Sequence, residues 1–291
     1  MTPCLALLAS IPSPSSNALH IGPFQLRAYG LMIALGVVAA VWLTGRRLEQ
    51  HGVGTREDMS AIALFAVPAG VVGSRIYHVI TDWKSFRGDW WRAFKIWEGG
   101  LGIWGGIAAG TLVAIWVARR RGVAPIPLID DAAPGLALAQ AIGRWGNYFN
   151  QELFGKPTTL PWALRVSDSK ATAAGYPPGT TFHPTFLYES LWNLALCAAL
   201  LVYDRRRRAA GRAFRPGRLF AMYVAGYTFA RFFIERLRVD PAYKLAGLRV
   251  NEWVSAVVFA LAILWLVTIG RRPLPVAEPV VAADADESTL D

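Results

Sequence analysis

Polar side chains that suit phosphate binding stand at the end of a largely apolar stretch. The run GRWGNYFNQELFG covers residues 143–155 and directly follows the sequence LIDDAAPGLALAQAI. Its polar members include Arg144, Asn147, Asn150 and Glu152. A guanidinium group holds phosphate oxygens through paired hydrogen bonds, and amides and carboxylates orient bound groups. These residue types favour recognition of a phosphate.

A second face with an arginine occurs further along the chain. Tyr227, Arg231 and Glu235 are spaced four residues apart, so they share one face of a helix. Arg144 and Arg231 lie about four and five residues before the ends of their predicted helices, which is about 6 Å or slightly more. Two arginines at one such depth form a receptor for a lipid phosphate and stabilise charge on a phosphate leaving group.

Each of these residues also has a simpler structural interpretation. An arginine near a helix end reaches the membrane interface with its long side chain, and Arg231 with Glu235 forms an ordinary i, i+4 ion pair. Tyr29 and Trp104 suit an aromatic belt, and the glycines of GGLGIWGG suit close helix packing. A functional site is nevertheless favoured, because polar or ionisable side chains from six predicted segments are expected at the same depth in the membrane.

The composition is typical of a polytopic membrane protein. Hydrophobic residues make up 54% of the 291 residues and charged residues 17%, whereas soluble domains carry about a quarter charged residues. A spanning helix needs about 20 apolar residues, and seven segments qualify, at about 29–45, 60–80, 101–118, 126–148, 186–203, 217–236 and 252–270. The predicted fold is an all-α polytopic membrane protein with seven transmembrane helices and a small extracytoplasmic head.

Arginine clusters predict the orientation of these helices. They follow the first, third, fifth and seventh segments, at residues 46–56, 119–121, 205–218 and 271–272. Because loops rich in Lys and Arg stay in the cytoplasm, the N-terminus is expected outside and the C-terminus inside. The net charge of +10 is thus mostly a topology signal, and no nucleic-acid partner is expected.

Three regions are predicted along the chain. Residues 1–28 form an extracytoplasmic N-terminal segment, residues 29–272 the seven-helix transmembrane domain, and residues 273–291 a disordered cytoplasmic tail. Within the middle region, residues 149–185 are rich in Pro, Gly and Thr and form the extracytoplasmic head, with a strand around WALRV. The acidic tail lacks the composition of a packed segment.

Further motifs accompany the polar run at 143–155. They are RAYGLM around Tyr29, GSRIYHV at 73–79, GGLGIWGG at 99–106, HPTFLYE at 183–189 and YTFARFFIERLR at 227–238. In type and order these motifs resemble those of the bacterial prolipoprotein diacylglyceryl transferase family. The resemblance extends over residues of about 20 to 270.

The resemblance implies a seven-helix enzyme of the bacterial cytoplasmic (inner) membrane, with residues 29–272 as its catalytic domain. Such an enzyme transfers the diacylglyceryl group of phosphatidylglycerol to the thiol of the lipobox cysteine in a prolipoprotein signal peptide. A thioether forms and glycerol phosphate leaves, as the first step of lipoprotein maturation. Neither a cofactor nor a metal is implied.

The resemblance also assigns roles to individual residues. The implied catalytic residues are Tyr29, Arg144, Asn147, Glu152 and Arg231. Those implied in binding phosphatidylglycerol are Arg144, Asn147, Gly155, Tyr227, Arg231, Glu235 and Arg238. Further candidates for the pocket are Arg75, Trp104 and His183.

One departure from the family pattern leaves the general base open. Trp104 stands where many members have a histidine. A cysteine thiol near two arginines has a lowered pKa, so we expect the reaction to proceed without a dedicated base. The rival bases are Tyr29, Glu152, Glu235 and, as the main one, His183.

The main alternative is a non-catalytic phospholipid-binding or lipid-transport protein with the same arginine pocket. Transporters often contain internal repeats, and none is visible in this sequence. A metal-dependent intramembrane protease would need an HExxH motif, which the histidine positions exclude.

Overall fold

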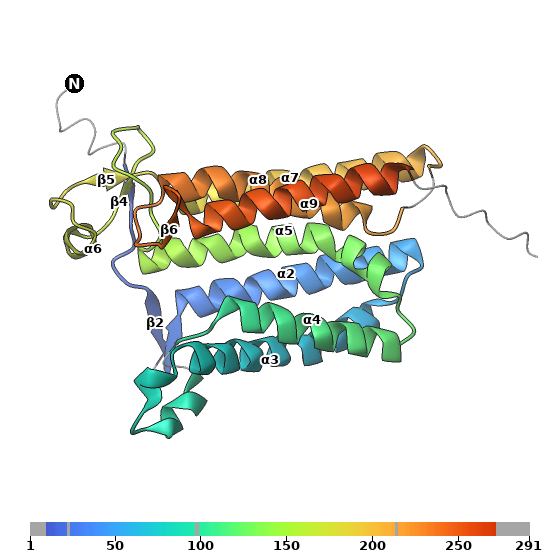
Figure 1. Ribbon diagram of the computed structural model, residues 1–291, viewed down its shortest axis with the longest axis horizontal. Coiled ribbons are helices and arrows are strands. Elements are labelled where there is room, and N and C mark those ends of the chain that lie inside the picture. The colour runs from blue at the N-terminus through green and yellow to red at the C-terminus, as the bar shows by residue number, and fades with distance from the viewer. Residues whose placement is uncertain (1–9, 22–23, 97–98, 213–214, 272–291) are drawn as a thin grey trace, which may run out of the picture.

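The computed structural model describes residues 10–21, 24–96, 99–212 and 215–271. Within them, seven long helices run side by side along the long axis of the molecule (Figure 1). Their bounds are α2 (Ala28–His51), α3 (Arg56–Thr81), α4 (Ile103–Arg120), α5 (Pro125–Asn150), α7 (Thr185–Ala209), α8 (Arg218–Leu237) and α9 (Val250–Arg271). Each coincides with one of the seven predicted segments, so the prediction that these segments are helical is confirmed. Residues 1–9 and the predicted tail at 273–291 lie outside the described residues.

Four of these helices are long and apolar enough to cross a membrane, namely α2, α3, α7 and α9. In α5 and α8 charged residues interrupt the apolar sequence, among them Asp130, Asp131 and Arg231. The shorter helix α4 ends in Arg119 and Arg120. The molecule is therefore a mostly helical protein with four candidate spans by length and composition.

The outer surface of the bundle is apolar. Leu64, Ile103 and Leu112 are each 69% exposed, and many other large apolar side chains on the same helices are also exposed. Soluble monomers rarely show large apolar patches of this kind, so the surface suits contact with lipid.

A small subdomain, here called the head, caps one end of the bundle (Figure 1). It contains the helix α6 (Asp168–Ala173) and a three-stranded sheet of β1 (Ile11–Pro12), β4 (Leu164–Arg165) and β5 (Thr181–Phe182). Strand β4 pairs with β1 in parallel and with β5 in antiparallel fashion. The strand predicted around WALRV is confirmed, but the sequence did not reveal that an N-terminal strand joins it.

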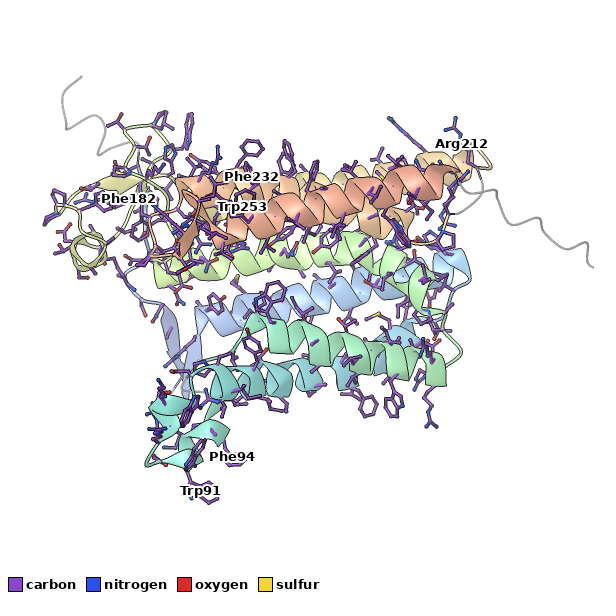
Figure 2. All side chains as sticks on the ribbon, viewed as in Figure 1. Trp91, Phe94, Phe182, Arg212, Phe232 and Trp253 are labelled. Atoms are coloured by element: carbon purple, nitrogen blue, oxygen red, sulfur yellow. The ribbon has the colours of Figure 1, made fainter. Side chains whose placement is uncertain are left out.

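Other short elements join the helices at the end that carries the head. The hairpin β2 (Ala18–Ile21) and β3 (Phe24–Arg27) leads into α2, and β6 (Lys244–Leu245) with β7 (Leu248–Arg249) joins α8 to α9. Two short 3-10 helices, η1 (Trp83–Phe86) and η2 (Trp90–Phe94), join α3 to α4. Trp91 and Phe94 of η2 point away from the bundle (Figure 2). These strands correct the all-α prediction to a mostly helical fold.

Glycines allow the helix backbones to approach closely. A Cβ at Gly36 of α2 would stand 2.9 Å from the carbonyl oxygen of Ala139 in α5. On the other side of the bundle, a Cβ at Gly73 of α3 would stand 2.5 Å from the carbonyl oxygen of Gly105 in α4. Small residues promote such contacts in membranes. The glycines at 99–106 therefore include packing residues, and the pairing of α2 with α5 brings Tyr29 beside the polar run.

Candidate active site

One buried carboxylate joins the two predicted arginines. Arg144 of α5 places its Nε 2.7 Å from Oε2 of Glu189 in α7, and Arg231 of α8 places its Nη1 3.6 Å from Oε1 of the same residue. The Glu189 side chain is 5% exposed. Three helices thus bring their charged groups together at the end that carries the head, and this end is where the sequence placed both arginines.

Sequence reasoning missed Glu189, although it is the last residue of the motif HPTFLYE. A signal was present, because a carboxylate inside a predicted membrane segment needs a cationic partner. Spacing along one helix does not reveal that partner, since Arg144 and Arg231 come from two other helices.

A second carboxylate, Glu235, holds Arg231 from its own helix. Its Oε2 lies 2.6 Å from Nη2 of Arg231 and 3.5 Å from Nη1 of Arg238. Its Oε1 lies 2.9 Å from Nη1 of Arg249, a residue at the end of β7 that the sequence did not single out. Because the Glu235 side chain is only 1% exposed and meets three guanidinium groups, it fixes the position of Arg231.

The polar run folds back on itself directly after α5. Gln151 adopts a left-handed conformation with φ of 51°, and the backbone N–H of Glu152 donates to the carbonyl of Asn147 at 3.1 Å. This reversal lets the Asn147 and Asn150 amides donate to Oε1 of Glu152 at 3.0 and 3.3 Å. The two amides and the carboxylate therefore form one preorganised group.

A recess of about 580 Å³ opens beside this group. Its polar lining includes Arg27, Tyr29, Asn150, Glu152 and Lys170. Tyr29 connects the recess with Arg144, because it interacts electrostatically with both Glu152 and Arg144. Its ring lies against α5 at Gly146, where an added Cβ would stand 2.6 Å from Cδ2 of Tyr29.

Gly155 connects the polar run to the end of α8. Its N–H donates to the carbonyl of His183 at 2.9 Å, and it forms an isolated β-bridge with Arg238. A Cβ at position 155 would stand 2.7 Å from Cβ of His183, so the junction has room only for glycine. Arg238 itself places its Nε 2.7 Å from Oδ1 of Asp240.

This arrangement suits a phosphate ester of a lipid. Each guanidinium carries five N–H donors, and the carboxylate contacts leave others for a ligand. A recess with these polar groups in its lining can admit a headgroup while acyl chains stay in the membrane.

Such a site fits either a transferase or a lipid-binding protein, and comparison with known proteins favours the transferase. The family model for prolipoprotein diacylglyceryl transferase matches residues 16–268 of this chain. The chain belongs to the prolipoprotein diacylglyceryl transferase family.

Similar proteins from several bacteria carry the same name. A protein of Streptomyces coelicolor named phosphatidylglycerol–prolipoprotein diacylglyceryl transferase 1 is 52% identical over 289 residues, which cover 98% of this chain and 80% of the relative. A similarly named transferase of Frankia alni is 52% identical over 92% of this chain and 69% of its own length. A third, from Streptomyces griseus, is 50% identical over 98% of this chain and 85% of its own length. Membership of this transferase family, together with the four apolar helices, identifies the chain as a membrane protein.

Arg75, one of three further candidates for the pocket, contacts the backbone between two helices of this member of the transferase family. Arg75 donates to the backbone carbonyls of Arg92, Ala93, Gly99 and Gly100 and so holds the segment between α3 and α4. Gly99 and Gly100 line the recess, which makes Arg75 a residue that shapes its wall.

Among the described residues, neither Trp104 nor His183 lines the recess. Trp104 is 57% exposed on the first turn of α4 and is not among the described residues that line the recess. His183 places its Nδ1 3.1 Å from the hydroxyl of Tyr188, which also accepts from Nε1 of Trp162. Tyr227, in contrast, interacts electrostatically with Arg144, as its place on the Arg231 face predicts.

Proposed function

We propose that this chain transfers the diacylglyceryl group of phosphatidylglycerol to the thiol of a cysteine in a prolipoprotein. The observation that carries the proposal is the pair Arg144 and Arg231, joined by Glu189 beside a recess at one level of the bundle. The names of relatives that are 50–52% identical to this chain support the same substrates.

The transfer is a substitution at the glyceryl carbon that carries the phosphate ester. The cysteine sulfur forms a C–S bond with this carbon while the C–O bond to phosphate breaks. The electron pair of that bond remains on the phosphate oxygen, so glycerol phosphate leaves and a thioether remains. The thiol proton passes to a base or to the solvent.

Arg144 and Arg231 bind the phosphate and stabilise the charge that grows on it as the C–O bond breaks. Preorganised donors are effective because they need no reorganisation during the reaction. Glu189 and Glu235 hold the two guanidinium groups in place and balance their charge before the lipid binds.

The other site residues support this phosphate receptor. Tyr29 and the group of Asn147 and Glu152 orient the substrates at the recess. Three further residues contribute to the binding of phosphatidylglycerol. Tyr227 does so beside Arg144. Gly155 and Arg238 do so by fixing the end of α8.

The proton acceptor is proposed to be dispensable. A thiol has a pKa of about 8.5, which neighbouring cations lower, and thiolates are strong nucleophiles. If a base takes part, Glu152 and Tyr29 are better placed than His183, because both line the recess whereas His183 contacts Tyr188.

The proposed topology has seven spans, with the N-terminus and the head outside the bacterial inner membrane. Arginine clusters at the opposite end of the bundle support it through the positive-inside rule. In this orientation the recess opens near the outer leaflet, where a lipobox cysteine of a signal peptide would arrive after export.

The direct test uses purified protein, phosphatidylglycerol and a lipobox peptide. The transferase adds a diacylglyceryl mass to the peptide cysteine and releases glycerol phosphate. Saturable lipid binding without either product would instead favour a phospholipid-binding or lipid-transport protein. A peptide with serine at the cysteine position is the matched control.

A further inference from the structure

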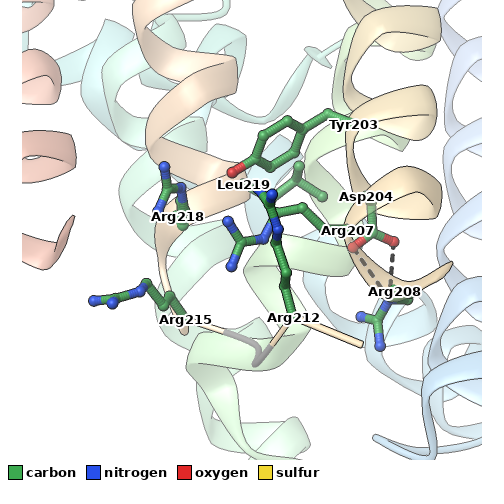
Figure 3. A pocket seen from close by; sticks show the side chains of 8 residues that line it. All are labelled: Tyr203, Asp204, Arg207, Arg208, Arg212, Arg215, Arg218 and Leu219. Atoms are coloured by element: carbon green, nitrogen blue, oxygen red, sulfur yellow. Dashed lines mark hydrogen bonds and ion pairs between the residues drawn. The ribbon is translucent and has the colours of Figure 1, made fainter. Parts of the chain in front are cut away.

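A basic pocket lies at the end of the bundle remote from the head (Figures 2 and 3). It is formed where α7 ends and α8 begins, and it has a volume of about 80 Å³. Its lining residues are Tyr203, Asp204, Arg207, Arg208, Arg212, Arg215, Arg218 and Leu219. Five arginines face one carboxylate in this lining, so positive charge is in large excess.

The single carboxylate is already shared among other cations. Asp204 lies 3.2 Å from Nη2 of Arg47, 3.3 Å from Nε2 of His51 and 3.1 Å from Nε of Arg208. It therefore contributes little to balancing the charge of Arg212 and Arg218, and Figure 3 shows it joined to Arg208 alone among the arginines of the pocket.

Two buried polar atoms in this pocket lack a hydrogen-bond partner among the described residues. They are the hydroxyl of Tyr203 and Nε of Arg218. The Arg218 guanidinium lies 5.9 Å from the centre of the Tyr203 ring, so the two groups are neighbours. Both atoms can donate, and a buried donor without an acceptor is unfavourable. The pocket thus matches a ligand group rich in acceptors and negative in charge.

An adjoining groove adds apolar surface. It has a volume of about 480 Å³ and shares Tyr203, Arg207 and Arg212 with the basic pocket. Along α7 it is lined by Ala199 and Val202, which lie toward the middle of the bundle. A phosphate-sized cup that continues into an apolar groove has the two-part character of a phospholipid site.

We propose that this pocket binds the phosphate of an anionic phospholipid from the leaflet at this end of the bundle, with an acyl chain in the groove. In the topology proposed above, this is the cytoplasmic leaflet, whose anionic lipids attract arginine clusters. The volume of about 80 Å³ is several times the ~10–15 Å³ that a cavity needs to hold one water molecule, which leaves room for a phosphate group. The bound lipid fastens α7 to the beginning of α8, the helix that carries Arg231 near its other end.

The test counts phosphatidic acid molecules on the full-length protein by native mass spectrometry. Phosphatidic acid is used because it is not the proposed substrate. The pocket variant is Arg212→Gln with Arg218→Gln, and the matched control is Arg119→Gln with Arg120→Gln, which removes the same charge from exposed positions at the same end. We expect the pocket variant to bind the tightest lipid about tenfold more weakly than the wild type and the control. Equal weakening in both variants would reduce the effect to general surface charge and overturn the proposal.

A second variant and a competitor separate the lipid from a free phosphate. Val202→Trp fills the groove and leaves all five arginines in place, so phosphatidic acid should bind more weakly to it. Inorganic phosphate should displace the lipid poorly from the wild type. Unchanged lipid affinity of Val202→Trp, or efficient displacement by inorganic phosphate, would contradict lipid binding. All these variants keep the residues of the proposed transfer reaction, so the lipid-binding results do not depend on whether the chain transfers diacylglyceryl groups.

Discussion

The buried pair Arg144 and Glu189 should be strongly coupled in stability. Its atoms Nε and Oε2 lie 2.7 Å apart, and the two side chains are 19% and 5% exposed. Removing one partner of a buried pair leaves an uncompensated charge and costs about 3–5 kcal/mol. Removing both avoids much of this cost. The double variant Arg144→Gln with Glu189→Gln should therefore be more stable than the sum of the single effects predicts, by about 2 kcal/mol or more.

The chain offers a matched control for this cycle. Arg56 and Glu49 also place Nε and Oε2 close together, at 2.6 Å, but their side chains are 57% and 37% exposed. An exposed pair contributes only about 0.2–1 kcal/mol. The two cycles are measured by denaturant unfolding in one mixed-micelle system, which gives free energies for all variants. Additivity within about 0.5 kcal/mol for the buried pair would refute the assignment of Glu189 as the shared counter-charge.

Three further predictions concern transfer activity and packing. Arg144→Ala and Arg231→Ala should each lower the transfer rate by about 10²–10³ in folded protein, because each removes a preorganised donor to the leaving group; near-normal product formation in a mass-spectrometric assay would refute this role. Gly155→Ala should lower the free energy of unfolding by about 1–3 kcal/mol, because its Cβ would crowd His183, and an unchanged unfolding midpoint would count against the tight junction. Trp104→Phe and His183→Gln should keep most of the activity and the pH profile of the rate, because neither residue lines the recess; an inactive but folded His183→Gln protein would make His183 the base.

The sequence was most informative where structure depends on local pattern. All seven predicted segments are helices, because each is a long, largely apolar run even where charged residues interrupt it. Arg231 contacts Glu235, and Tyr227 lines one pocket with Arg231, as their helical spacing requires. The amides of the polar run also reach Glu152, since only a few residues separate them.

Contacts between residues far apart in the sequence could not be predicted from local patterns. Asn17 donates to Asn150 across 133 positions, and Arg249 reaches Glu235 from a hairpin after α8. Neither contact leaves a periodic signal in the chain. Arg75 was expected in the pocket because of its charge, but its donors are used by backbone carbonyls whose arrangement depends on the fold between α3 and α4.

The most direct test of the central claim is a structure with a stable phosphatidylglycerol analogue bound. In the analogue a methylene carbon replaces the oxygen between the glyceryl carbon and phosphorus, so that the C–O bond broken in transfer is absent and no transfer can occur. We predict phosphonate oxygens within hydrogen-bond distance of the guanidinium groups of both Arg144 and Arg231. A phosphonate bound only by Arg27 and Lys170 in the recess, with Arg144 and Arg231 still held only by Glu189 and Glu235, would contradict the account.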